Sequence, residues 1–161
     1  MGAVKEMTEN GVLRLAEPAD AALLTALRME MLREVAEEIP PHLPQAILQY
    51  LQNGLRDGSC LCAILEKDGS PAATAMLCLA QSVPDECNAT GRYALLSSVY
   101  TLPQYRGNGF MEALLRWLLA RGREAGVREV FLGAERKAIP LYERLGFVLT
   151  ETEMYLPLDP L

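Results

Sequence analysis

The stretch Val99-Tyr-Thr-Leu-Pro-Gln-Tyr-Arg-Gly-Asn-Gly-Phe-Met111 joins a predicted strand to a predicted helix through a turn that contains two glycines. Residues 93–100 form an apolar run typical of a buried strand, and Pro103 ends it because proline lacks the donor that a sheet needs. Apolar residues then recur with a helical period until Gly126, which predicts a helix capped at its C-terminus. The apolar positions are Met111, Leu114, Leu115, Leu118 and Ala125.

The start of this helix is expected to bind an anion. The first backbone N–H groups of a helix have no partner within it, and the helix dipole adds partial positive charge. Gly107 and Gly109 tolerate a positive φ and place no Cβ in front of these groups, so a diphosphate can lie against the main chain. The same two glycines also fit a tight turn that binds nothing.

Two common phosphate-binding motifs do not fit this turn. A dinucleotide-binding turn needs a third glycine or alanine three residues after the second glycine, where this chain has Glu112. A nucleoside-triphosphate loop ends in Gly-Lys-Ser/Thr, whereas Asn108-Gly109-Phe110 supplies neither the lysine nor the hydroxyl. Both of these readings are therefore excluded.

The residues Gln104-Tyr-Arg-Gly-Asn-Gly109 resemble the Gln/Arg-x-x-Gly-x-Gly/Ala signature of the GNAT superfamily of acyl-CoA-dependent N-acyltransferases. A second segment, Leu141-Tyr-Glu-Arg-Leu-Gly-Phe147, is similar to the late helix of that family, in which a tyrosine precedes a Leu-Gly-Phe helix end. The resemblance covers residues 95–156 well, whereas residues before about 59 match only in layout. It implies an N-acetyltransferase that moves an acetyl group from acetyl-CoA to a primary amine.

The resemblance also implies which residues hold acetyl-CoA or coenzyme A. The diphosphate is expected on the backbone of the turn, and the pantetheine arm is expected to pair like an added strand with the main chain of Val99 and Thr101. The N–H of Val99 is then the expected oxyanion donor. The expected cofactor-binding residues of the turn are Gln104, Arg106, Gly107, Asn108, Gly109, Phe110 and Met111.

Tyr142 is the general acid that the resemblance implies, and it is expected to contact the cofactor. A phenol near the sulfur can donate a proton as the thiolate develops. Tyr142 also shares one apolar helical face with Ala138, Leu141 and Leu145, so a plain core position fits it as well. We favour the acid role.

No general base stands out in the sequence. Residues 94–101 contain no acid, and Ser97 and Ser98 supply only hydroxyls that can hold a water. Glu135 is either a base or a solvated acid at a helix start, and we favour the second. The acidic residues Glu30, Glu34, Glu37 and Glu38 are expected to form a solvated face first and an amine-attracting rim second. Because no base is assigned, a non-catalytic acyl-CoA-binding module stays the alternative to an enzyme.

The remaining patterns predict alternating strands and helices. The expected elements are strand 11–15, a helix opening at 17–20, helix 44–55, the hairpin strands 60–66 and 72–80, strand 93–100, the helix after Arg106, strand 128–132, helix 136–145 and strand 147–158. This order predicts an α/β (α+β) fold with a mixed, mostly antiparallel central sheet flanked by helices. The length of 161 residues fits one domain over 11–161 after a loose tail at 1–10.

The charge and composition of the chain limit the classes of partner that it is expected to bind. The net charge is −6 and no basic stripe is interleaved with aromatics, so nucleic acid is not expected. Residues 104–146 nevertheless hold eight Arg or Lys against five Glu, which suits a polyanionic cofactor. The expected acceptor is a small-molecule or peptide amine, and a homodimer stays open.

Neither a metal nor a membrane is expected. The four cysteines lack metal-ligand spacing, and the one histidine, His42, lies between prolines in a predicted loop. No apolar run approaches the roughly 20 residues that span a bilayer. Residues 1–10 also lack the basic and apolar regions of a secretory signal, which favours a cytoplasmic location.

Overall fold

The computed structural model of the protein describes residues 4–158. Six strands form one sheet in sequence order, antiparallel except for the parallel pair between the last two. They are β1 (Lys5–Thr8), β2 (Gly11–Leu15), β3 (Cys60–Lys67), β4 (Ser70–Gln81), β5 (Arg92–Thr101) and β6 (Glu129–Phe131). The helices are α1 (Ala21–Val35), α2 (Leu43–Asp57), α3 (Phe110–Glu124) and α4 (Ile139–Arg144), with 3-10 turns η1 (Pro18–Asp20), η2 (Pro103–Tyr105) and η3 (Arg136–Ala138). The predicted mixed, mostly antiparallel sheet flanked by helices is confirmed.

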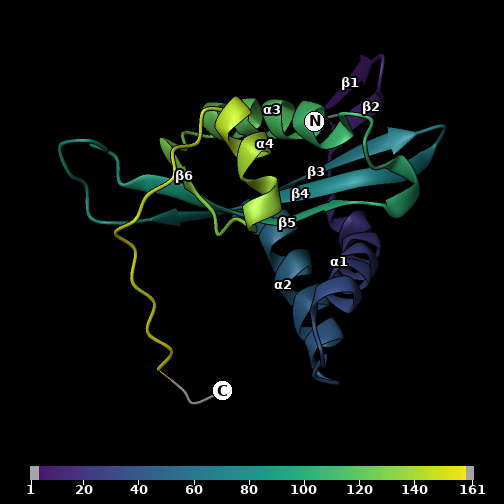
Figure 1. The fold of residues 1–161 in the computed structure, drawn as a ribbon, viewed down its shortest axis with the longest axis horizontal. Helices are drawn as coiled ribbons and strands as arrows, with labels where there is room; N and C mark the ends of the chain where they lie inside the picture. Colours follow the sequence, from purple (N-terminus) through teal and green to yellow (C-terminus); the bar gives the residue numbers. More distant parts are fainter. Residues whose placement is uncertain (1–3, 159–161) are drawn as a thin grey trace.

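Helices cover both faces of the sheet. Figure 1 shows α1 and α2 on one face and α3 and α4 on the other. Under α3, Leu114 and Leu118 are completely buried in one cluster with Leu77 of β4. On the opposite face, Leu24 of α1 clusters with Ile64 of β3. Because β3 and β4 are covered on both sides, their sequences read as continuous apolar runs rather than as alternating ones.

The expected loose tail over residues 1–10 is wrong where the structure describes a strand. Lys5–Thr8 pairs with β2 in a hairpin, and the Thr8 hydroxyl donates to the carbonyl of Gly11 at 3.0 Å. The carboxylate of Glu6 accepts a hydrogen bond from the indole of Trp117 on α3 at 2.7 Å. The strand is polar because it forms the edge of the sheet. Residues 1–3 lie outside the described residues.

The expected final strand over residues 147–158 is also wrong. The chain after α4 has no strand as far as residue 158, and Figure 1 shows it running away from the sheet as the yellow segment. The apolar side chains on it are largely exposed, and these are Val148, Leu149, Met154, Tyr155, Leu156 and Leu158. Aromatic and β-branched residues in this segment supply β-propensity, but a strand also needs a partner, and the edge strand β6 is only three residues long.

An ion-pair network around Arg14 ties β2 to η1 and β3. The guanidinium of Arg14 contacts the carboxylate of Asp20 at 2.7 and 2.9 Å and that of Glu66 at 2.7 Å. The side chains of Arg14 and Asp20 are only 12% and 16% exposed. The hydrogen bond from Arg14 holds the pKa of the Asp20 carboxyl below its usual value.

Replacing Arg14 should therefore cost stability in a pH-dependent way. We expect Arg14→Met to lower the free energy of unfolding by about 3 kcal/mol, because two partly buried carboxylates lose their partner. The stabilisation that Asp20 contributes is complete above about pH 4, near the ordinary pKa of this carboxyl group. It is lost as the pH falls through the lowered pKa that Asp20 has in the folded protein. Urea denaturation at neutral and acidic pH measures this difference. The control Arg116→Met removes an exposed helical pair and should cost under about 1 kcal/mol. Equal losses in the two variants would contradict the prediction.

Candidate functional site

The turn between β5 and α3 has the backbone geometry that its glycines predict. Gly107 and Gly109 have φ values of 78° and 74°, and Gly109 is the N-cap of α3. Residues other than glycine rarely adopt this left-handed conformation. A Cβ added to either glycine would meet no atom within 4 Å, so both face open space in front of the helix.

Five consecutive amides at this turn lack a partner. Within residues 4–158, no carbonyl or side chain accepts a hydrogen bond from the backbone N–H of Gly107, Asn108, Gly109, Phe110 or Met111. The side chain of Asn108 instead donates to two carbonyls at the start of the turn and holds its shape. Five free donors at the positive end of a helix form an arrangement that suits a diphosphate.

Arg106 differs from the expectation, because its backbone and side chain are both engaged. Its N–H donates to the carbonyl of Pro103 at 3.3 Å, so this amide is not free for a diphosphate. Its guanidinium binds both carboxylate oxygens of Glu34 at 2.7 and 2.8 Å and the carbonyl of Thr101 at 2.9 Å. It also lies 5.6 Å from the centre of the Tyr100 ring. Arg106 therefore links the turn to α1.

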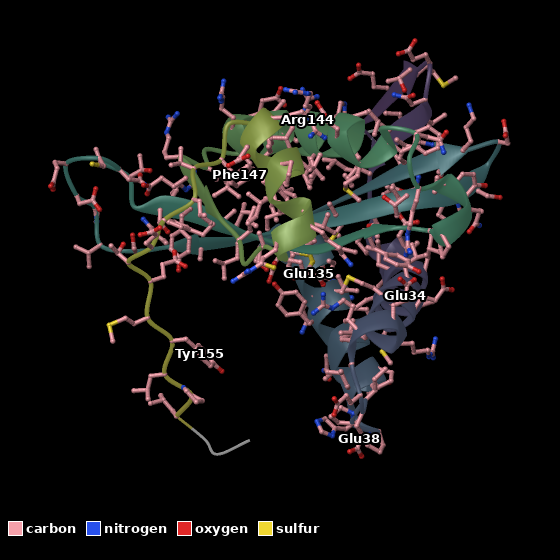
Figure 2. The ribbon with its side chains drawn as sticks, in the orientation of Figure 1. Glu34, Glu38, Glu135, Arg144, Phe147 and Tyr155 are labelled. Atoms are coloured by element: carbon pink, nitrogen blue, oxygen red, sulfur yellow. The ribbon has the colours of Figure 1, made fainter. Side chains whose placement is uncertain are left out.

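Glu34 is exposed, as expected of a solvated acidic face, but two side chains hold its carboxylate in place. The Tyr100 hydroxyl donates to it at 2.7 Å, and hydrogen bonds from Tyr100 and then Arg106 hold its pKa below the usual value. Figure 2 shows Glu34 close to the sheet, whereas Glu38 lies at the far tip beyond α1. Glu34 and Glu38 therefore lie apart from one another.

The open edge of β5 lies where the pantetheine arm was expected. β5 pairs with β6 only from Tyr93 to Leu95, although β5 continues to Thr101. Its pairing with β4 is broken by a register shift opposite Val99, and the preceding Ser98 has a positive φ of 51°. The part of β5 that carries Val99 and Thr101 is thus free of a β6 partner.

Tyr142 lies on α4 and combines burial with a free hydroxyl. The residue is 8% exposed, and its ring packs edge-on against Phe147 with 5.7 Å between the centroids. Its hydroxyl makes no hydrogen bond to residues 4–158, yet it is not sealed from solvent. Burial, with a contribution from Glu135, raises the pKa of Tyr142 and keeps the phenol protonated. Both the core role and the acid role suit this position.

Glu135 is placed as a solvated acid. Its side chain is 59% exposed and pairs with Lys137 at 3.0 Å. Figure 2 shows it at the opposite end of the last helical segment from Arg144, which binds Glu112 of α3. β5 carries no carboxylate between Ala94 and Thr101, so no general base is apparent on that strand.

Two cavities flank the sheet, and the glycine turn lines neither of them. One of about 630 Å³ lies between the end of α3, β6 and the chain after α4, and Tyr142 is in its wall. The other, of about 350 Å³, lies between α1, α2 and the sheet. Its walls include Arg28 of α1 and Ser98 of β5, whose Oγ accepts a hydrogen bond from the Arg28 guanidinium at 3.1 Å.

Sequence reasoning missed the smaller cavity. The signal that points to it is Arg28 itself, which stands on the same helical face as the buried residues Ala21 and Leu24. A charged residue on an apolar helical face is unusual. Its neighbours across the cavity come from four other elements, which no local pattern brings together.

No three metal-ligating side chains come together within residues 4–158. None of the helices in the described part of the chain has the length and apolarity needed to cross a membrane.

Comparison with known proteins gives a consistent result. The sequence model of the acetyltransferase (GNAT) family matches residues 24–147, which is well over half of the chain. The fold is similar to that of a predicted acetyltransferase with acetyl-CoA from Clostridium acetobutylicum, with a TM-score of 0.83 and 27% identity, covering 91% of this chain and 95% of the other. It is also similar to a GCN5-related N-acetyltransferase from Ralstonia eutropha JMP134, with a TM-score of 0.77 and 26% identity, covering 91% and 97%.

A shorter match concerns a sugar acetyltransferase. Over 63 residues the chain is 38% identical to a glucosamine 6-phosphate N-acetyltransferase from Trypanosoma brucei brucei. The matched part is 39% of this chain and spans under half, 43%, of that relative.

Proposed function

Because this chain belongs to the acetyltransferase (GNAT) family, we propose that it transfers an acetyl group from acetyl-CoA to a primary amine by direct attack. The observation that carries the proposal is the run of five unpartnered amides, residues 107–111, at the start of α3. GNAT acetyltransferases use acetyl-CoA, and a turn of free N–H groups is the kind of site that its diphosphate requires.

Different segments of the chain bind different parts of acetyl-CoA. The amides of residues 107–111 hold the diphosphate, and the main chain of Val99 and Thr101 pairs with the pantetheine arm along the open edge of β5. Arg106 holds the turn against Glu34 of α1 and does not offer its amide to the ligand. Bound in this way, acetyl-CoA supplies an activated acetyl thioester.

Two groups of the chain then act on the reaction. The amine forms a C–N bond with the acetyl carbon, and the N–H of Val99 donates to the oxygen that becomes negative. The C–S bond breaks, and the Tyr142 phenol gives its proton to the departing thiolate. The amine loses one proton to solvent, a step to which we assign no side chain, and the Tyr142 phenolate regains one proton from solvent.

The three cysteines of β3 and β4 do not supply an acyl-enzyme intermediate in this proposal. Cys78 faces the cavity of about 350 Å³, and burial raises the pKa of its thiol, which keeps it protonated and a poor nucleophile. Cys60 and Cys62 are buried in the core.

A non-catalytic acyl-CoA-binding module is the second candidate. The observations that favour it are the lack of a carboxylate on β5 and the engagement of Glu34 in an ion pair. Such a module would bind acetyl-CoA through the same turn but would leave the thioester intact.

Direct attack has a kinetic signature. We expect initial velocities at varied acetyl-CoA and amine concentrations to give intersecting double-reciprocal lines, because both substrates must be bound together. Mass spectrometry of protein mixed with acetyl-CoA alone should show no acetylated cysteine. Parallel lines together with an acetylated protein would contradict the direct mechanism and indicate an acyl-enzyme.

A further inference from the structure

Arg28 carries a charge that the described fold does not neutralise. Its side chain is half-buried, and its one hydrogen bond within residues 4–158 runs from Nη1 to the Ser98 hydroxyl. No carboxylate in this part of the chain lies within ion-pair distance of it. Burial lowers the pKa of Arg28, but an arginine remains charged in a protein at neutral pH.

A second half-buried arginine, on β2, does have counter-ions within the described residues. Arg14 has two carboxylate partners, Asp20 and Glu66, at 2.7 Å each. A buried charge without a counter-ion is costly, and removal from water is repaid only by good partners. The contrast indicates that the partner of Arg28 is not part of the chain described here.

The cavity in front of Arg28 suits a small molecule. Its volume of about 350 Å³ is near the lower end of the range of ligand pockets. Most of its wall is apolar and comes from Leu24, Ile47, Leu51 and Met76. Two of the hydroxyls in the wall are already used, because Thr74 donates to a carbonyl and Tyr100 donates to Glu34.

The position of Arg28 relates this cavity to the proposed reaction. Ser98, which accepts the hydrogen bond from Arg28, directly precedes Val99, the proposed oxyanion donor. A ligand held by Arg28 therefore lies on the α1 side of β5, the strand whose Val99 N–H is proposed to donate to the acetyl oxygen.

We propose that Arg28 binds an oxyanion of the amine substrate, so that the acceptor is a small amine that also carries a carboxylate or a phosphate. This inference rests on the proposed acetyl transfer. The guanidinium presents a planar fork of N–H donors that matches two oxygens of either group. The apolar walls accommodate the rest of the acceptor.

Matched pairs of amines test the inference. Acetyl-CoA turnover is measured with phenylalanine against phenethylamine, with leucine against 3-methylbutylamine, and with glucosamine 6-phosphate against glucosamine. The members of each pair differ in the anionic group. We expect wild type to prefer the anionic member of at least one pair by about 100-fold in kcat/KM, as for other sites built around a buried charge. The carboxylate and phosphate pairs separate the two sources of the anion.

Two variants connect that preference to Arg28. In Arg28→Gln the selectivity ratio should fall by about 100-fold, and in Arg28→Lys, which keeps the charge but not the fork, it should fall less. Arg33→Gln is the matched control, because Arg33 lies on the same helix but is exposed and outside the cavity. Thermal melts establish that each variant is folded. If Arg28→Gln does not fold, the selectivity ratio is tested with Arg28→Lys instead.

The outcomes separate this inference from the proposed function. Acetylation of the amines without any preference for the anionic members, or a ratio unchanged in a folded Arg28 variant, overturns the inference and leaves the acetyl transfer standing. Acetylation of none of the six amines by the wild-type protein overturns the proposed transfer for this substrate class and the inference with it.

Discussion

Gly109→Val is expected to abolish acetyl-CoA binding while the protein stays folded. Gly109 has a φ of 74° at the N-cap of α3, and a β-branched residue resists that conformation. Its side chain would also project into the open space in front of the amides of residues 107–111, where the diphosphate is proposed to lie. We expect the dissociation constant for acetyl-CoA, measured by titration calorimetry, to rise by at least about 100-fold. The Gly107→Val variant should show a rise of the same size.

Gly58→Val provides a matched control for the backbone. Gly58 caps α2 with a φ of 77°, and a Cβ there also meets no atom within 4 Å. The valine should cost about 1–2 kcal/mol of stability at either position, because both place a side chain in the left-handed region. Only the variants of the turn should lose acetyl-CoA. If a folded Gly109→Val protein binds acetyl-CoA as tightly as wild type, the diphosphate does not lie on these amides.

Tyr142→Phe is expected to slow the chemical step without weakening cofactor binding. The phenol is needed only as thiolate charge develops, so kcat and kcat/KM should fall together. We expect a loss of about 10-fold to several hundredfold, because acid–base groups contribute about 100- to 10,000-fold and a water can partly replace the hydroxyl. The hydroxyl has no partner within residues 4–158, so its removal leaves no described polar group unpaired and the melting temperature should change little.

Tyr93→Phe is the control for this substitution. Tyr93 also packs edge-on against a phenylalanine, Phe131, with 5.8 Å between the ring centroids, and it is far from the glycine turn along β5. Its turnover should stay at the wild-type level. Unchanged turnover in a folded Tyr142→Phe protein would reduce Tyr142 to a core residue and would favour the non-catalytic module.

The parts of the site that the sequence predicts are those written in a short stretch of chain. The turn is predicted correctly because several signals lie next to one another in the chain. They are the apolar run of the strand, the proline, the two glycines and the apolar period of α3. The free amides follow from the same segment, because the start of any helix leaves its first N–H groups without partners. Tyr142 is placed on its helix by the same kind of local pattern, although its role stays a prediction.

The parts that the sequence does not predict depend on contacts between distant residues. Arg106 meets Glu34 across 72 positions and Arg28 meets Ser98 across 70, so neither contact leaves a local pattern. At the N-terminus the hairpin turn is Glu9-Asn10, and Gly11 follows it at the start of β2, a position where a turn favours glycine. At the C-terminus the local signal was misleading, since residues 147–158 are rich in residues with β-propensity but have no described pairing partner.

Turnover of acetyl-CoA with an amine acceptor tests the central claim most directly. The release of the coenzyme A thiol and the formation of the N-acetylated amine are followed together, with and without each amine. The proposed function predicts one thiol released for each acetylated amine, and only slow release when the amine is omitted. A protein that binds acetyl-CoA stoichiometrically but releases no thiol with any amine would contradict it.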